Sequence, residues 1–323
     1  MMRKPIWIDT DVGFDDMAAL AMVHSDPNWA VLGLGLSYGN ARLDQAVAQA
    51  QRMRGFFGWR TPLHAGSAKP ILGPAMTGEA LFGPTGLRTI GRTLPDCESE
   101  IAREDAVTGM TRALAGADAP VTVLALGPLT NIAIALLARP ELARLIERIV
   151  WMGGAAIGGN HTATTEFNAA CDPEALAIVL ESGVAFRMIG LECCRQVTIT
   201  GTDAAKLRAL QTERARILAD LMDGYVRLAS VDGSRPMPVY DAVAAAAVLD
   251  DRAVAFIAAN ISVERAGALT RGTTICEFRP QKAAPNAEIA RTALATRVFD
   301  RLLADFTAAA VADPASDTIS RAS

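Results

Sequence analysis

The sequence predicts a single α/β domain with a mostly parallel open sheet and helices on both faces, a Rossmann-like arrangement. Short apolar segments typical of buried strands alternate with longer helical segments along the chain, which is the pattern of strand–helix–strand units. The 323 residues are 51% hydrophobic and 20% charged, enough apolar material for one large core. No linker divides the chain, so we expect one domain over residues 1–312 and a frayed polar tail over residues 313–323.

The expected strands are short apolar runs that end in turn or polar residues. They are residues 5–9, 30–37, 121–126, 148–152 and 186–190. The expected helices are longer segments, and one of them begins at Asp172-Pro173, where proline suits the first helical position. They are residues 17–24, 43–57, 129–137, 173–181, 207–228 and 242–249. The stretch 70–96 is rich in Gly, Pro and Thr and predicts a long functional loop.

Composition excludes several classes of partner. The net charge is −4 and no Lys/Arg-rich run occurs, so we expect no binding to nucleic acid. The five cysteines form no CxxC motif, which favours reduced thiols in a cytoplasmic protein over a zinc site or a disulfide framework. The N-terminus meets four acids before any signal-like apolar stretch, and no apolar run approaches the length of a membrane span. We therefore expect a cytoplasmic location and no membrane contact.

The most informative segment holds four aspartates within eight residues, directly after the first apolar run. They are Asp9, Asp11, Asp15 and Asp16. A strand, a loop with Gly13 and a new helix place these carboxylates at the C-terminal edge of the sheet, where open α/β folds bind ligands. Because like charges repel, the loop predicts a hard divalent cation with oxygen ligands.

Three other interpretations explain less of this loop. Asp15 or Asp16 could cap the following helix, which accounts for two aspartates but not four. An EF-hand fits poorly, because counting from Asp9 places Gly13 at its fifth position and Leu20 at its twelfth. Phosphoryl transfer through an aspartyl nucleophile would want a well-placed lysine, and the chain has only four, Lys4, Lys69, Lys206 and Lys282.

Polar residues also follow the other expected strands. They are Ser37–Asn40, the segment 126–131, the segment 152–160 with Glu166 and Asn168, and the segment 238–241 before the apolar helix. In a doubly wound sheet these strand ends meet at one crevice. Carboxylates and amides around a hard cation suit a neutral polyhydroxyl ligand such as a sugar, although Asn131 or Asp241 taken singly could equally be a helix cap.

These motifs together resemble the calcium-dependent nucleoside hydrolases, the inosine-uridine preferring nucleoside N-ribohydrolases. The resemblance covers about residues 5–290 and rests on IDTDVGFDDMAAL, LGPLTNIA, WMGGAAIGGNHTATTEFNAACDPEAL, YDAVAAAAVLD and ERAGALTRGTT. It implies hydrolysis of the N-glycosidic bond of ribonucleosides to ribose and free base, in nucleoside salvage, by a homodimer or homotetramer.

The resemblance also implies roles for particular residues. Asp11, Asp16 and Asp241 would be side-chain ligands of Ca²⁺, and Leu126 would contribute its backbone carbonyl. Asp11 would activate a water on the calcium ion, which then attacks the anomeric carbon. Residues implied to bind ribose are Asp15, Asn40, Asn160, Glu166 and Asn168.

The chain departs from the family where histidines are usual. Tyr240 and Phe82 occupy the two positions, so the usual acid for the leaving base is missing there. His161 is a candidate for that role, although a lone histidine is most often structural or solvated. Glu192 stands where the family has Asp, and we interpret it as a packing variation.

Phe82 and Tyr240 can stack on the two faces of a base or simply pack in the core. Stacking predicts that purine nucleosides are weakly favoured, within an enzyme that accepts purine and pyrimidine ribonucleosides. The alternative function is a catalytically weak, metal-dependent protein that binds ribose or nucleosides and has lost its acid.

Overall fold

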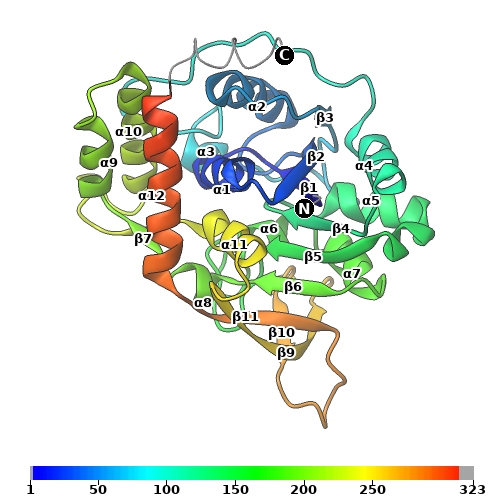
Figure 1. Cartoon of the computed structure of the whole chain (residues 1–323). Helices are drawn as coiled ribbons and strands as arrows, with labels where there is room; N and C mark the ends of the chain where they lie inside the picture. Colours follow the sequence, from blue (N-terminus) through cyan, green and yellow to red (C-terminus); the bar gives the residue numbers. More distant parts are fainter. Residues whose placement is uncertain (1–2, 313–323) are drawn as a thin grey trace.

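A nine-stranded sheet runs through the computed structural model, which describes residues 3–312 (Figure 1). The strand order is β10-β9-β11-β6-β5-β4-β1-β2-β3, with bounds β1 Lys4–Thr10, β2 Trp29–Leu36, β3 Leu63–Ala65, β4 Val121–Ala125, β5 Ile146–Met152, β6 Phe186–Ile189, β9 Val254–Val263, β10 Thr274–Glu277 and β11 Ala287–Ala293. Neighbouring strands run parallel from β3 to β11, and β9 pairs antiparallel with β10 and β11. The expected single-domain, mostly parallel α/β fold is confirmed.

Helices cover both faces of this sheet. Their bounds are α1 Phe14–Ser25, α2 Leu43–Phe57, α3 Glu79–Phe82, α4 Ala106–Gly116, α5 Thr130–Ala138, η1 Pro140–Arg144, α6 Phe167–Cys171, α7 Pro173–Glu181, α8 Leu191–Cys194, α9 Gly201–Arg208, α10 Glu213–Val226, α11 Tyr240–Leu249 and α12 Ala295–Val311. Two short strands, β7 Thr198–Ile199 and β8 Met237–Pro238, pair separately. Alternate side chains of β1 serve the two layers. Ile6 and Ile8 pack with α1, α10 and α11, whereas Trp7 packs with α4, α5 and α7.

Most expected elements occur within a few residues of their expected bounds, but the long helix over residues 207–228 is wrong. It is two helices, α9 and α10, separated by a turn in which Gln211 has φ 60°. Thr212 then caps α10 by accepting from the Ala215 N–H at 2.9 Å. The sequence reasoning did not anticipate β3, α4, α12 or the antiparallel strands of the last third.

The C-terminal ends of the parallel strands lie at one edge of the sheet, and the site is built on the loops that leave this edge. Asp9 near the end of β1 pairs with Gly35 of β2 and Ala125 of β4, and Ala125 pairs with Trp151 of β5. The loops after β1, β2, β4 and β5 therefore leave the same edge of the sheet, as the sequence predicted.

A long connection between β3 and α4 lies over this edge and contains the short helix α3. Its beginning is tied to α7 by the Ile71 N–H, which donates to Asp172 at 2.9 Å. Its later part is tied to α10, because the backbone N–H of Arg92 donates to Asp220 at 3.0 Å and its guanidinium donates at 3.2 Å. The expected long loop over residues 70–96 is thus held at both ends.

Within residues 3–312, none of the helices has both the length and the apolar character needed to cross a bilayer. The tail expected to be frayed, residues 313–323, lies outside the described residues.

Candidate active site

The acidic loop between β1 and α1 is built on a strained backbone. Val12 has φ 63°, a left-handed conformation that a β-branched residue rarely adopts. The Asp16 carboxylate holds this turn, because it accepts the Thr10 hydroxyl at 2.5 Å and the Gly13 N–H at 2.7 Å. Strain of this kind persists where the surroundings fix it, and it clusters at functional sites.

Asp11 is held by Asn40 from the loop after β2. The backbone N–H of Asn40 donates to one Asp11 oxygen at 2.7 Å, and its side-chain amide donates to the other at 3.1 Å. The same amide reaches Asp16 at 3.2 Å. A Cβ at Gly39 would collide with the Asp11 carboxylate, so glycine is required for this close approach. Asn40, expected to bind sugar, has its donors engaged in orienting Asp11.

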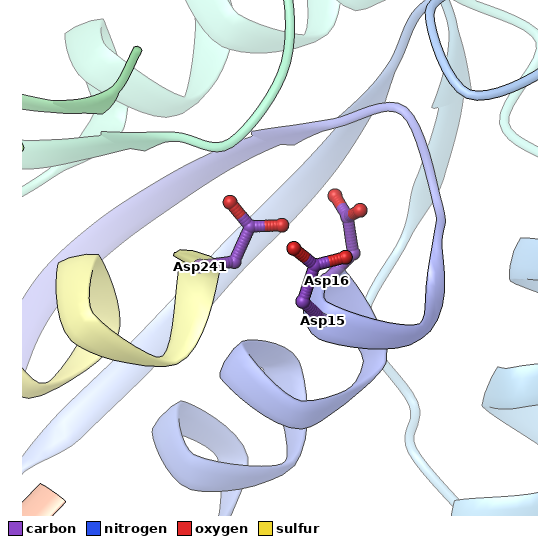
Figure 2. A group of neighbouring side chains, drawn as sticks. All are labelled: Asp15, Asp16 and Asp241. Atoms are coloured by element: carbon purple, nitrogen blue, oxygen red, sulfur yellow. The ribbon is translucent and has the colours of Figure 1, made fainter. Parts of the chain in front are cut away.

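Figure 2 shows the carboxylates of Asp15 and Asp16, from the start of α1, facing that of Asp241 from the start of α11. One oxygen of each lies within 4.8 Å of the others. The structure therefore gathers Asp15 with two of the three expected ligands. Asp11 stands outside this tight group but is joined to Asp16 through the Asn40 amide.

Burial and mutual repulsion disfavour the charged form of the carboxylates in this cluster. Burial raises the pKa of Asp15 to about 7, with a further increase from the charge of Asp16. Burial also raises the pKa values of Asp11, Asp16 and Asp241 above their ordinary range, and neighbouring carboxylates add to the effect at Asp11 and Asp241. Among the described residues, Asp241 Oδ1 is buried without a hydrogen-bond partner. Buried, crowded oxygens with an unpaired acceptor fit a hard divalent cation.

Glu166 and Asn168 lie at the start of α6 and contact the segments that follow β4 and β5. Glu166 caps this helix by accepting the N–H groups of Asn168 at 2.9 Å and Ala169 at 3.0 Å, and it also accepts the Gly154 N–H at 2.9 Å. The Asn168 amide donates to the carbonyls of Leu126 at 2.9 Å and Met152 at 3.1 Å. Both side chains are thus fixed at the ends of β4 and β5.

One cavity of about 400 Å³ joins these groups. Its lining includes each expected site residue except Asp16, which is fully buried beneath it. The lining residues expected from the sequence are Asp11, Asp15, Asn40, Phe82, Leu126, Asn160, Glu166, Asn168, Tyr240 and Asp241. Carboxylates and amides crowd part of this cavity, and apolar or aromatic side chains from α3, α6 and the β8–α11 segment line the remainder.

Tyr225 of α10 lines the cavity and was missed by the sequence reasoning. Its hydroxyl lies 3.2 Å from Asp15 and 2.8 Å from the carbonyl of Pro238, and donates to these acceptors. Its ring stacks on Phe14 with a centroid distance of 4.9 Å. The sequence reasoning placed Tyr225 only within a long helix, because no neighbouring polar motif marks that part of α10 as belonging to the site.

Asp9, the first of the four aspartates, does not line the cavity. One of its oxygens accepts from Asn131 at 3.0 Å, and burial raises its pKa to about 7. Asn131 also accepts the Ser67 N–H at 2.8 Å. Asp9 therefore links β1, α5 and the start of the long connection, which is a structural role.

The chain is similar to known proteins over most of its length. Residues 6–300 match the family model described as inosine-uridine preferring nucleoside hydrolase. A relative from Shewanella woodyi, named pyrimidine-specific ribonucleoside hydrolase RihA, is 34% identical over 280 residues, which are 85% of this chain and 89% of the relative. A protein of the same name from Enterobacter sp. is 33% identical over 281 residues, covering 86% of this chain and 89% of the relative. Among solved structures, a purine-preferring ribonucleoside hydrolase from Gardnerella vaginalis superposes with a TM-score of 0.87 at 27% identity, over 95% of this chain and 99% of that chain.

Proposed function

Because the chain belongs to the inosine-uridine preferring nucleoside hydrolase family, we propose that its cavity hydrolyses the N-glycosidic bond of ribonucleosides to give ribose and a free base. One observation carries this proposal: a cluster of buried carboxylates opens into the same 400 Å³ cavity as an aromatic wall. The carboxylates and amides suit a sugar with vicinal hydroxyls. The aromatic wall suits a flat heterocycle.

We further propose that the resident cation is Ca²⁺. Asp16 and Asp241 would hold it, with Asp11, the Leu126 carbonyl and Asp15 nearby. Calcium accepts carboxylates, carbonyls, waters and hydroxyls in a flexible shell. When bound, it supplies positive charge that acidifies water and orients vicinal hydroxyls. The unpaired Asp241 Oδ1 and the raised pKa values of the cluster support a cation there.

The chain's own residues then have separate tasks. Asp11, oriented by two hydrogen bonds from Asn40, removes a proton from the water that attacks C1′. Asp15, Asn160, Glu166 and Asn168 hold the ribose. As the bond to the base lengthens, positive charge develops on the sugar, and the carboxylates around it stabilise this oxocarbenium-like state.

The proposed base preference is a weak one for purines. Relatives named RihA are described as pyrimidine-specific, whereas the Gardnerella protein is described as purine-preferring. Phe82 of α3 and Tyr240 of α11 both line the cavity here, and stacking between such rings and the larger purine face would give that preference. Phe82 and Tyr240 can also accept a pyrimidine.

Replacing Tyr240 separates stacking from proton donation. Burial, with the charge of Asp15, raises the pKa of Tyr240 to about 12, so its hydroxyl is a poor acid near neutral pH. We expect Tyr240→Phe to keep most of the kcat/KM for inosine. Tyr240→Ala loses the ring and should lower kcat/KM by roughly 2–10-fold, the amount that one aromatic contact contributes.

The measurement is a reducing-sugar assay with purified protein and inosine, adenosine and uridine. Tyr38→Phe is the matched control, because Tyr38 is a buried tyrosine whose hydroxyl donates to the Cys171 carbonyl at 3.2 Å. Equal losses in Tyr240→Phe and Tyr240→Ala would assign the effect to the hydroxyl. A strong preference for uridine would contradict the stacking proposal. Tight binding of all three nucleosides without sugar release would instead favour the binding-protein alternative.

A further inference from the structure

The three histidines of the chain have different environments. His24 is half-buried, with ring nitrogens 2.8 Å from the Leu20 carbonyl and 2.9 Å from Thr61. His64 is buried with Nδ1 3.1 Å from the Glu104 carbonyl. His161 is exposed and lines the cavity. Within residues 3–312 its ring contacts Phe167, and neither of its nitrogens has a hydrogen-bond partner. An imidazole with free nitrogens is therefore available to a ligand in the cavity.

The loop that carries His161 is anchored by residues outside the cavity lining. Glu192 of α8 accepts the N–H of Ala156 at 3.1 Å and that of Ile157 at 2.8 Å. Arg195 donates to the Gly159 carbonyl at 3.0 Å. Glu192 was interpreted from the sequence as a packing variation, but its carboxylate fixes the start of this loop.

The end of the loop is anchored as well. Asn160 Oδ1 accepts the Phe167 N–H at 2.9 Å, and the N–H groups of Asn160 and His161 donate to the Thr165 carbonyl at 3.3 and 3.1 Å. His161 therefore projects from a loop that is hydrogen-bonded on both sides. These hydrogen bonds fix the backbone from which the His161 side chain enters the cavity lining.

His161 lies on the aromatic part of the cavity. Its ring centroid is 5.9 Å from that of Phe167, in an edge-to-face arrangement. His161 follows Asn160 and Phe167 precedes Asn168 in the sequence, and all four residues line the same cavity. Phe82 and Tyr240, the proposed stacking partners of the base, line that cavity as well.

The other polar side chains that line the cavity are poorly suited to donate a proton to the leaving base. Burial raises the pKa of Tyr240 to about 12, and burial also raises the pKa of Tyr225 well above its ordinary value. Glu166 has both oxygens engaged by backbone N–H groups. Asp15 and Asp241 belong to the group of three carboxylates that would hold the cation, and Asp11 is the proposed base. Imidazole is the side chain whose proton exchange spans pH 5–8.

We propose that His161 is the catalytic acid that protonates the leaving base. This inference rests on the proposed hydrolase function and adds a residue to it. As the C1′–N bond breaks, its electron pair passes to the base, and a ring nitrogen of the imidazolium gives its proton to the base. Water supplies hydroxide to C1′ and its proton to Asp11, and solvent returns that proton to the imidazole. The sum is nucleoside plus water giving ribose plus base.

The test compares leaving groups that need a proton with one that does not. His161→Gln and His161→Ala are assayed with inosine, uridine and 4-nitrophenyl β-ribofuranoside, whose phenolate departs without protonation. We expect kcat/KM for both nucleosides to fall about 10²-fold, within the range for loss of a general acid. The aryl riboside should be cleaved by both variants as by the unmodified protein, and added imidazole should restore part of the inosine activity of His161→Ala.

Ile157→Gln is the matched control, because Ile157 is 82% exposed in the same loop and does not line the cavity. Equal losses on nucleosides and on the aryl riboside would assign His161 to loop or sugar positioning and overturn the proposal. Full activity of both variants on nucleosides would also overturn it. An unmodified protein that cleaves none of the three ribosides would contradict the hydrolase function itself, which distinguishes that failure from the first two.

Discussion

Asp11→Ala is expected to lower kcat for inosine by about 10²–10⁴-fold, the usual contribution of a positioned general base. Asn40 gives Asp11 two hydrogen bonds, and a Cβ at Gly39 would collide with its carboxylate. This environment fixes the orientation of one carboxylate at the cavity wall. Asp11→Asn keeps the size of the side chain but removes its basicity, so its kcat should fall by a similar factor.

The measurement is kcat by release of reducing sugar, with circular dichroism and thermal unfolding to show that the variants fold. Asp44→Asn is the matched control, because Asp44 lies in the first turn of α2 with a side chain 67% exposed. Its activity should equal that of the unmodified protein. An Asp11→Asn variant with substantial kcat would exclude Asp11 as the base.

The second large effect concerns the sugar. We expect kcat/KM for 2′-deoxyinosine to be about 10⁴-fold below that for inosine, because a site built to bind a substrate hydroxyl rejects the analogue that lacks it by 10⁴–10⁵. Asp15 lines the cavity, and the Tyr225 hydroxyl lies 3.2 Å from its carboxylate. A missing sugar hydroxyl leaves the Asp15 carboxylate without that partner, which is costly in a buried site.

The ratio of the two kcat/KM values is the informative quantity. Asp15→Ala should lower the value for inosine more than that for 2′-deoxyinosine, so the ratio should narrow. Tyr38→Phe should leave the ratio unchanged. Comparable kcat/KM values for inosine and 2′-deoxyinosine in the unmodified protein would show that Asp15 does not recognise the 2′-hydroxyl.

The sequence predicted the sheet and its binding edge because both depend on local patterns. The residues from Lys4 to Ser25 read as strand, acidic loop and helix, and the structure has β1 and α1 there. The family resemblance, and not the rule that parallel strands end at one edge, placed Asp241 with the first loop, because the strand before it, β8, belongs to the separate two-stranded sheet. The direction of Asp9 was also available, because alternation along β1 places it with Trp7, away from the cavity.

Features that depend on irregular backbone were not predictable in this way. The left-handed residue Gln211 breaks an otherwise continuous helical pattern. The contact between Tyr225 and Asp15 joins residues 210 positions apart, so no local pattern indicates it. No local pattern indicates that the Glu192 carboxylate holds the loop that bears His161. This contact joins α8 to Ile157, which lies 35 residues earlier in the chain. The antiparallel strands β9, β10 and β11 depend on long-range pairing.

The dependence of ribose release on Ca²⁺ is the decisive measurement for the proposed hydrolase. Purified protein is treated with a chelator, freed of it, and assayed for ribose release from inosine and uridine while Ca²⁺ is added back and bound metal is measured. The prediction is that stripping abolishes release and Ca²⁺ restores it, and that Asp241→Asn needs a higher Ca²⁺ concentration than the unmodified protein. Full activity in the metal-stripped protein, with no metal detected, would show that ribose release does not need a bound cation.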